Sequence, residues 1–323
     1  MRDLWTMRRL IVGLCLGILA AGLSLPAAAA NAAAPASRAN NAKAAHPAAK
    51  VKTATPAMWT VRGSRGTVYM LGSIHALPKN VNWQTPQLMA RLKQADTFVF
   101  EVPMDSESKA HAIDYFRQNA LMPMGMSLPS MFDEEMRSDF RDVVMVTHAD
   151  PTYIVYMRPW LAALVLEGTA SGATGFYSSE GVDNKVYALA KSRGVRQFRA
   201  LERDEDQFRL FIKEGHVQDE VADLRITFKD ILANQGKGDR GLFAAWMRGD
   251  TRALEHALPE NKGTSAKFRK EWLENRNRKW VPQIEAMLNE PHTFFITVGA
   301  AHLVGKTGVP GLLRAAGYRV NGP

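Results

Sequence analysis

Two segments far apart in the chain each run from apolar residues into glycine and then histidine. Residues 67–71 lead into a Gly-x-x-His phrase that ends at His75, and residues 294–298 lead into one that ends at His302. Short apolar runs that stop at glycine are typical of buried β-strands. Ligands of open α/β sheets bind at the edge where such strands end. We therefore expect the two histidines at one edge of a central sheet.

The remaining pattern predicts an α/β fold with a mixed central sheet, flanking helices and a helix-rich middle. Strands are expected at 59–62, 67–71, 97–102, 195–201, 293–298 and 318–320. Helical spacing of apolar residues predicts helices from 86 and over 133–146, 152–166, 183–193, 203–214, 219–234, 242–248 and 265–288. Strand, Gly-x-x-His, helix and strand follow one another near both ends, which suggests two related halves.

The N-terminus has the layout of a secretory signal. Arg8 and Arg9 precede an apolar run over 10–25, and small residues at 28–30 suit cleavage. We predict a Sec signal peptide over 1–30, a disordered Ala/Pro-rich linker over 31–57 and one folded domain over 58–323. The location is then periplasmic or secreted, with no stable membrane anchor after cleavage.

The composition excludes thiol chemistry and argues against a nucleic-acid partner. The single cysteine, Cys15, lies in the signal segment, so the predicted mature protein has no thiol for disulfides, catalysis or zinc. The 323 residues carry a net charge of +9, but the positive residues are scattered. We therefore expect no nucleic-acid partner.

Three residues form the predicted catalytic centre. His75 and His302 offer two imidazoles, and Glu101 stands at the end of the apolar strand over 97–102. A buried carboxylate is costly unless a cation compensates it, although a salt bridge to arginine would serve as well as a metal. Imidazole and carboxylate together suit a divalent first-row ion such as manganese, cobalt, iron or zinc.

Further polar residues accompany this centre. Glu180 and Asp183 open a helix, and Asp183 suits either catalysis or a plain N-cap. Glu202 follows another predicted strand. Arg276 and Asn277 lie on a long helix, where the alternatives are a solvated face and binding of a substrate carboxylate or oxyanion.

These phrases together resemble the TraB/GumN family, in its GumN-like bacterial branch. The resemblance rests on residues 71–78, Phe100-Glu101-Val102, residues 180–183, Leu201-Glu202, Arg276-Asn277, residues 298–305 and residues 308–313. It covers the chain from about Trp59 to the end. The wider fold resembles erythromycin esterase and a haem-binding lipoprotein of the ChaN type.

The family includes the TIKI membrane proteases, which use two Gly-x-x-His motifs, a glutamate and manganese or cobalt. The resemblance thus implies that His75, His302 and Glu101 bind a metal that activates water to attack a peptide or other small amide. Glu101 would be a ligand or the general base, with Glu180 or Asp183 as another possible base. The alternatives are a non-catalytic peptide- or haem-binding protein and an accessory protein of exopolysaccharide production.

Overall fold

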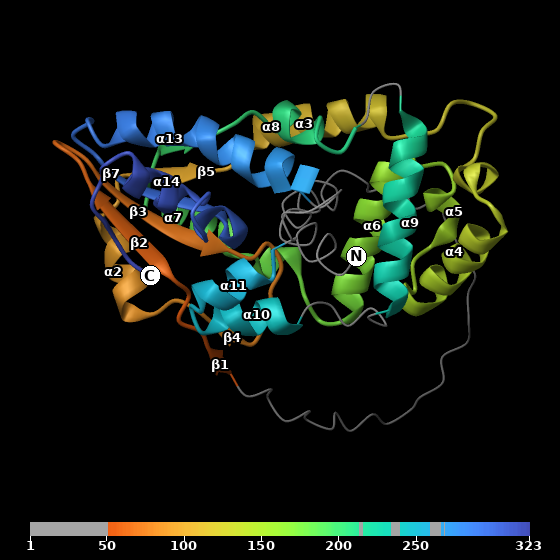
Figure 1. The fold of residues 1–323 in the computed structure, drawn as a ribbon, viewed down its shortest axis with the longest axis horizontal. Coiled ribbons are helices and arrows are strands. Elements are labelled where there is room, and N and C mark those ends of the chain that lie inside the picture. Colours follow the sequence, from red (N-terminus) through yellow and green to blue (C-terminus); the bar gives the residue numbers. More distant parts are fainter. Residues whose placement is uncertain (1–50, 213–215, 234–239, 259–265, 268) are drawn as a thin grey trace, which may run out of the picture.

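The computed structural model describes residues 51–212, 216–233, 240–258, 266–267 and 269–323 (Figure 1). The predicted signal peptide over 1–30 and most of the predicted linker lie outside these residues. The secretory location therefore stays a prediction. No helix in the described ranges is both long and apolar enough to cross a bilayer.

The centre of the fold is a mixed six-stranded sheet. Its order is β6-β5-β7-β3-β2-β8. The strands are β2 (Met58–Arg62), β3 (Thr67–Ser73), β5 (Thr97–Phe100), β6 (Gln197–Ala200), β7 (Thr293–Gly299) and β8 (Val320–Asn321). Strands β6, β5, β7 and β3 are parallel, whereas β2 and β8 are antiparallel to their neighbours. This confirms the predicted α/β fold with a mixed sheet.

The two Gly-x-x-His phrases start side by side. Strands β3 and β7 are direct neighbours, and their register pairs Gly72 with Val298 and Ser73 with Gly299. Every side chain of β7 from Phe294 onward is buried, as expected for a central parallel strand covered on both faces. The register thus places His75 and His302 at the same sheet edge.

Helices cover both faces of the sheet and form a bundle beyond its carboxyl edge (Figure 1). They are α2 (Pro86–Gln94), α3 (Ser106–Asn119), α4 (Glu134–Thr147), α5 (Pro151–Ile154), α6 (Pro159–Ala173), α7 (Val182–Ser192), α8 (Asp204–Phe208), α9 (Val217–Ala233), α10 (Arg240–Met247), α11 (Thr251–His256), α13 (Asn275–Met287) and α14 (Val309–Ala315). One sheet face packs against α2, α7, α10 and α11, and the other against α13 and α14. A third core joins α4, α6 and α9.

The middle of the chain departs from the predicted helices in three places. The helix expected over 152–166 is broken into α5 and α6, because Pro159 forces Arg158 into an extended conformation (ψ 152°). The helix expected over 203–214 ends as α8 at Phe208. Ahead of α13, residues Lys270–Glu274 form a π-helical turn, and Pro282 lies within α13.

Folded structure also begins earlier than residue 58. Strand β1 (Lys52–Thr53) pairs in parallel with β4 (Val81–Asn82), and Ala54 is fully buried. These residues belong to the predicted linker. They gain backbone partners and a core contact from distant parts of the chain. No local pattern in such a short segment predicts these contacts.

Candidate functional site

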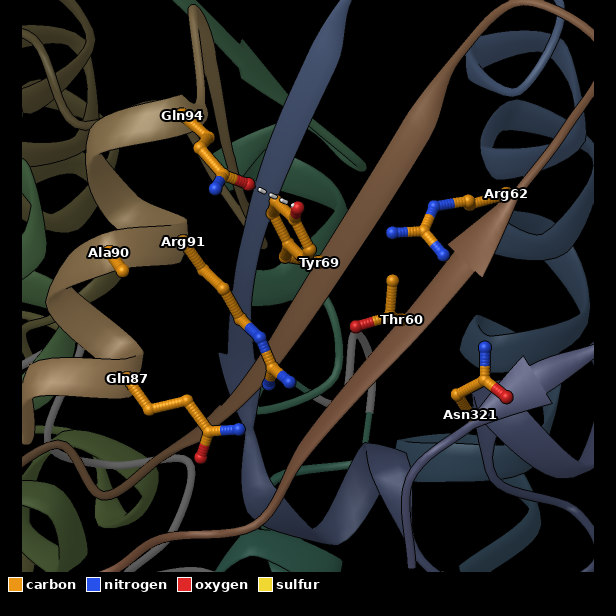
Figure 2. A pocket seen from close by; sticks show the side chains of 8 residues that line it. All are labelled: Thr60, Arg62, Tyr69, Gln87, Ala90, Arg91, Gln94 and Asn321. Carbon is orange, nitrogen blue, oxygen red and sulfur yellow. Dashed lines mark hydrogen bonds between the residues drawn. The ribbon is translucent and has the colours of Figure 1, made fainter.

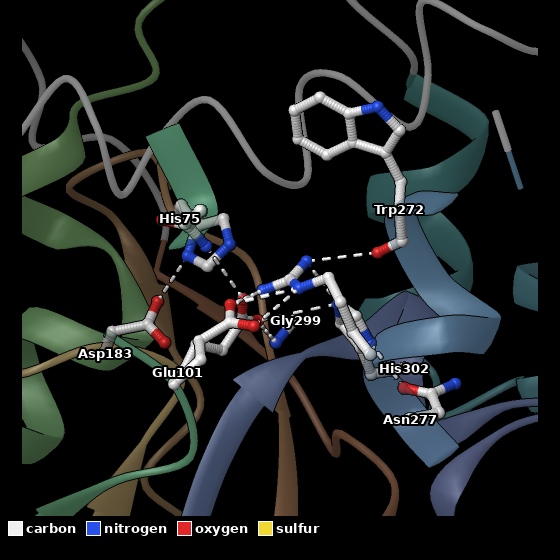
Figure 3. A network of polar contacts seen from close by, with 10 residues as sticks. His75, Glu101, Asp183, Trp272, Asn277, Gly299 and His302 are labelled. Carbon is white, nitrogen blue, oxygen red and sulfur yellow. Dashed lines mark hydrogen bonds and ion pairs between the residues drawn. The ribbon is translucent and has the colours of Figure 1, made fainter. Parts of the chain in front are cut away.

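The carboxyl edge of the sheet gathers a buried polar cluster (Figure 3). Its two histidines follow β3 and β7, Glu101 follows β5, and Glu202 follows β6. Helix α7 contributes Asp183. The start of α13 contributes Arg276 and Asn277. All of these except Glu202 are at most 4% exposed.

His75 is oriented by a carboxylate. Its Nδ1 lies 2.7 Å from Asp183 Oδ2. The backbone N–H of Val182 donates to the carbonyl of Ile74, which fixes the first turn of α7 against the loop after β3. Gly181 is required at this contact, because a Cβ there would lie 2.1 Å from the His75 carbonyl oxygen. With Nδ1–H donated to Asp183, the Nε2 of His75 is left to act as a base or ligand.

His302 is held in the same tautomer by an amide. Asn277 Oδ1 lies 2.6 Å from His302 Nδ1, and the Asn277 amide nitrogen donates to the carbonyl of Thr307. The ring packs against Trp280 in a tilted arrangement, with ring centroids 4.4 Å apart. Unlike His75, however, His302 has its Nε2 occupied, since Arg276 Nη1 lies 3.1 Å away.

Arg276 ties the cluster together. Its Nη2 donates to Glu101 Oε2 (2.6 Å) and to Glu202, its Nε donates to Glu202 (3.0 Å), and its Nη1 donates to the carbonyl of Trp272 (3.1 Å) as well as to His302. A guanidinium has five N–H groups, and all five of these have partners. Arg276 therefore acts on any further group through its charge rather than through a free donor.

Glu101 lies beneath a small space above Gly299. Its Oε1 accepts the Gly299 N–H (2.6 Å), and its Oε2 accepts from Arg276 and from Gln207 (3.3 Å). A Cβ added to Gly299 would lie 3.2 Å from Glu101 Oε1, 3.6 Å from His75 Nε2 and 3.7 Å from His302 Cδ2. The absent side chain of Gly299 thus leaves room at the point where the three predicted residues converge.

The surroundings of the two histidines shift their pKa values in opposite directions. Burial tends to lower the pKa of His75, but the charge and hydrogen bond of Asp183, with the charge of Glu101, raise it overall. Burial lowers the pKa of His302 to about 3, and Arg276 adds to this while Glu101 opposes it. His302 is therefore neutral at pH 7, whereas the pKa of His75 lies above the ordinary value of an imidazole.

The two glutamates are separated in the same way. Burial tends to raise the pKa of Glu101, but Arg276 outweighs it and brings the pKa to about 2. Burial raises the pKa of Glu202 in spite of Arg276, and the charge of Glu101 adds to that rise. Pairs of like groups with opposed pKa shifts are frequent in catalytic sites.

The structure places only some of the predicted acids in the cluster, and the cluster also contains residues that were not predicted. Asp183 faces His75, whereas Glu180 pairs with Lys185 at 2.9 Å on the surface. Glu202 holds Arg276. Gln207, from α8, was not predicted because a glutamine in a short polar helix gives no signal of its own. Trp280 packs against His302 and Arg276, but its position in the sequence predicts only an ordinary core residue.

The metal implied by the resemblance does not fit this arrangement. Within the described ranges no three His, Cys, Asp or Glu side chains are grouped to hold an ion. The donor types are suitable, but Arg276 takes the lone pair of His302 Nε2 and one oxygen of Glu101. A divalent ion would have to displace a buried guanidinium that carries the same sign of charge. The first-row metal stays a prediction, and no step below is routed through it.

Fold and site together define an α/β protein with a histidine–carboxylate cluster at the carboxyl edge of its sheet. The chain belongs to the TraB/PrgY/gumN family, whose sequence model matches residues 57–322. It is 22% identical over 258 residues to the uncharacterized protein YbaP of Shigella flexneri and, equally, to that of Escherichia coli. In both comparisons 79% of this chain and 90% of the relative are covered. No solved structure matches the chain.

Proposed function

We propose that the protein is a hydrolase that cleaves a peptide or other small amide, with His75 as the general base. One observation carries the proposal. In the described part of the chain, His75 Nε2 has no protein partner, borders the space above Gly299, and belongs to a ring whose Nδ1 is fixed by Asp183. A histidine held in this way is suited to proton transfer at its far nitrogen.

The proposed reaction moves one proton from water to the leaving amine by way of His75. His75 Nε2 takes a proton from water while the water oxygen bonds to the amide carbon. When the carbon–nitrogen bond of the tetrahedral intermediate breaks, the same proton passes from Nε2 to the leaving amine. Asp183 stabilises the imidazolium that exists between these two transfers and keeps the ring in the productive tautomer.

The other residues supply fixed electrostatics. Arg276 places a positive charge in a buried region, where charge interactions are much stronger than in water. Glu101 and Glu202 keep that guanidinium in place. His302 is neutral and anchored by Asn277 and Arg276, so it shapes the site without competing for the proton.

The test is hydrolysis of a quenched-fluorescence peptide library by the purified chain. We expect His75→Ala to reduce turnover by about 10²–10⁴-fold, the usual contribution of a general base. His292→Ala is the matched control, because His292 also has its Nδ1 beside an aspartate, Asp96 at 3.1 Å, but lies on the surface. Equal turnover by wild type and His75→Ala, or a folded wild type that cleaves nothing, would overturn the proposal.

A second function, binding without cleavage, is favoured by a specific observation. Glu101, Glu202 and Arg276 satisfy one another, as expected of a structural ion cluster. His75 would then be a ligand for a bound peptide or haem. Haem titration separates the two functions, because a Soret shift that disappears in His75→Ala, without peptide cleavage by wild type, supports binding alone.

A further inference from the structure

A groove lies between helix α2 and strands β2, β3 and β8 of the sheet (Figure 2). Strands β2 and β8 extend the sheet beyond α2, so this helix covers only part of the face. The register aligns Asn321, Thr60 and Tyr69 as neighbours across β8, β2 and β3. The groove has a volume of about 380 Å³. That volume falls in the range of small-molecule sites, roughly 300–1,000 Å³.

The opposite wall of the groove is one face of α2. Gln87, Arg91 and Gln94 recur at helical spacing and line it, while Leu88 and Leu92 point to the core. Tyr69 donates its hydroxyl hydrogen to Gln94 Oε1 at 2.6 Å. This bond turns the amide nitrogen of Gln94 away from the tyrosine, as a donor.

The groove carries two positive charges and no negative one. Arg62 from β2 and Arg91 from α2 both extend into the space between the helix and the strands (Figure 2). No carboxylate is among the lining residues. The guanidinium of Arg91 lies 5.8 Å from the centre of the Tyr69 ring, which holds it over the groove. In the described part of the structure neither arginine has a carboxylate partner.

We propose that this groove binds an acidic sugar, that is, a carboxylate or phosphate carried on a small hydroxylated molecule. Guanidinium groups bind such oxyanions through paired hydrogen bonds. The side-chain amides of Gln87, Gln94 and Asn321, with the hydroxyl of Thr60, supply donors and acceptors suited to sugar hydroxyls. The two arginines approach from opposite walls, so the anion binds between α2 and β2 and the hydroxyl groups lie along the amides.

The proposal is tested by calorimetric titration of the full chain with glucuronate, glucose 6-phosphate, glucose and inorganic phosphate. We expect both acidic sugars to bind and glucose to fail, because glucose lacks the anion. Inorganic phosphate is expected to bind at least ~10-fold more weakly than glucose 6-phosphate, since it lacks the hydroxyl contacts. Comparing the two acidic sugars distinguishes a carboxylate ligand from a phosphate ligand.

Arginine variants locate the site. We expect Arg91→Gln and Arg62→Gln each to weaken binding by ~10-fold or more. Arg65→Gln is the control, because Arg65 lies in the exposed turn between β2 and β3 and does not line the groove. Circular dichroism confirms that each variant is folded. Failure of both acidic sugars to bind, glucose binding as well as they do, or equal loss in Arg65→Gln would overturn the proposal.

Discussion

Gly299→Ala should separate the chemistry of the site from the stability of the fold. The backbone of Gly299 (φ −49°, ψ 135°) suits alanine, so the substitution imposes no conformational strain. Its methyl group would enter the space between His75 Nε2, at 3.6 Å, and Glu101 Oε1, at 3.2 Å. A water bonded to Nε2 needs to lie at roughly 2.6–3.2 Å. The methyl group would therefore exclude water from the Gly299 side of the base.

The expected magnitudes differ sharply. Replacing glycine reduces the entropy of the unfolded chain, which stabilises by about 0.4–1 kcal/mol, and the close contact with Glu101 offsets this gain. We therefore expect the free energy of unfolding to change by less than about 1 kcal/mol, while turnover falls by about 10²–10⁴-fold. Urea denaturation and the peptide-library assay measure the two quantities.

Gly172→Ala is the control for this prediction. A Cβ at Gly172, within α6, meets no atom within 4 Å. The control should therefore keep full turnover and gain slightly in stability. The reasoning is refuted if Gly299→Ala folds normally and hydrolyses peptides at the wild-type rate.

Three further predictions concern the charges of the site. Arg276→Met should lower the free energy of unfolding by about 3–5 kcal/mol, because it leaves the buried Glu101 and the half-buried Glu202 without their cation. The exposed neighbour variant Arg278→Met should stay within about 0.5 kcal/mol. The pKa of His302 is about 3 in the folded state, which is lower than in the unfolded state, so the unfolded chain binds more protons in acid. By urea denaturation, the free energy of unfolding of wild type should fall by about 2 kcal/mol between pH 6.5 and 5. The fall in His302→Gln should be smaller by that amount. Dialysis against a chelator should leave peptide turnover unchanged, because Arg276 already occupies the donors that an ion would use.

Each has a clear contrary outcome. Equal destabilisation by the Arg276 and Arg278 variants would show that the guanidinium cluster does not stabilise the fold. The same slope of stability with pH in wild type and His302→Gln would mean that His302 is not buried and neutral. One bound metal ion per chain that is lost in His302→Ala, together with inactivation by chelator, would restore the metal site implied by the resemblance.

The sequence predicts the position of the site better than the hydrogen bonds and ion pairs within it. His75, Glu101 and His302 follow apolar strands, and the ends of neighbouring parallel strands necessarily meet at one edge. Arg276 could be named as a candidate, but its five N–H groups bond to four residues from four different parts of the chain. A charged run on a helix is compatible with a solvated face as well as with burial, and only the folded packing decides between them.

Three other features were not predicted from the sequence, each for a different reason. Glu180 and Asp183 are both candidates in the sequence, but Glu180 lies in the turn before α7 and pairs with Lys185, whereas Asp183 lies in the first turn of α7 beside His75. The break between α5 and α6 could have been read from Pro159, since the residue before proline disfavours helix. Strand β1 depends on pairing with β4, which no local pattern encodes.

The most direct test of the proposed base is the pH dependence of kcat/KM for wild type and Asp183→Asn. His75 acts when deprotonated, and Asp183 raises its pKa. Wild type should therefore lose activity as pH falls through a midpoint above about 6.5. Asp183→Asn should have a lower plateau, because the ring loses its fixed tautomer, and a midpoint shifted to lower pH. An unchanged plateau and midpoint in Asp183→Asn would contradict the assignment of His75 as the general base.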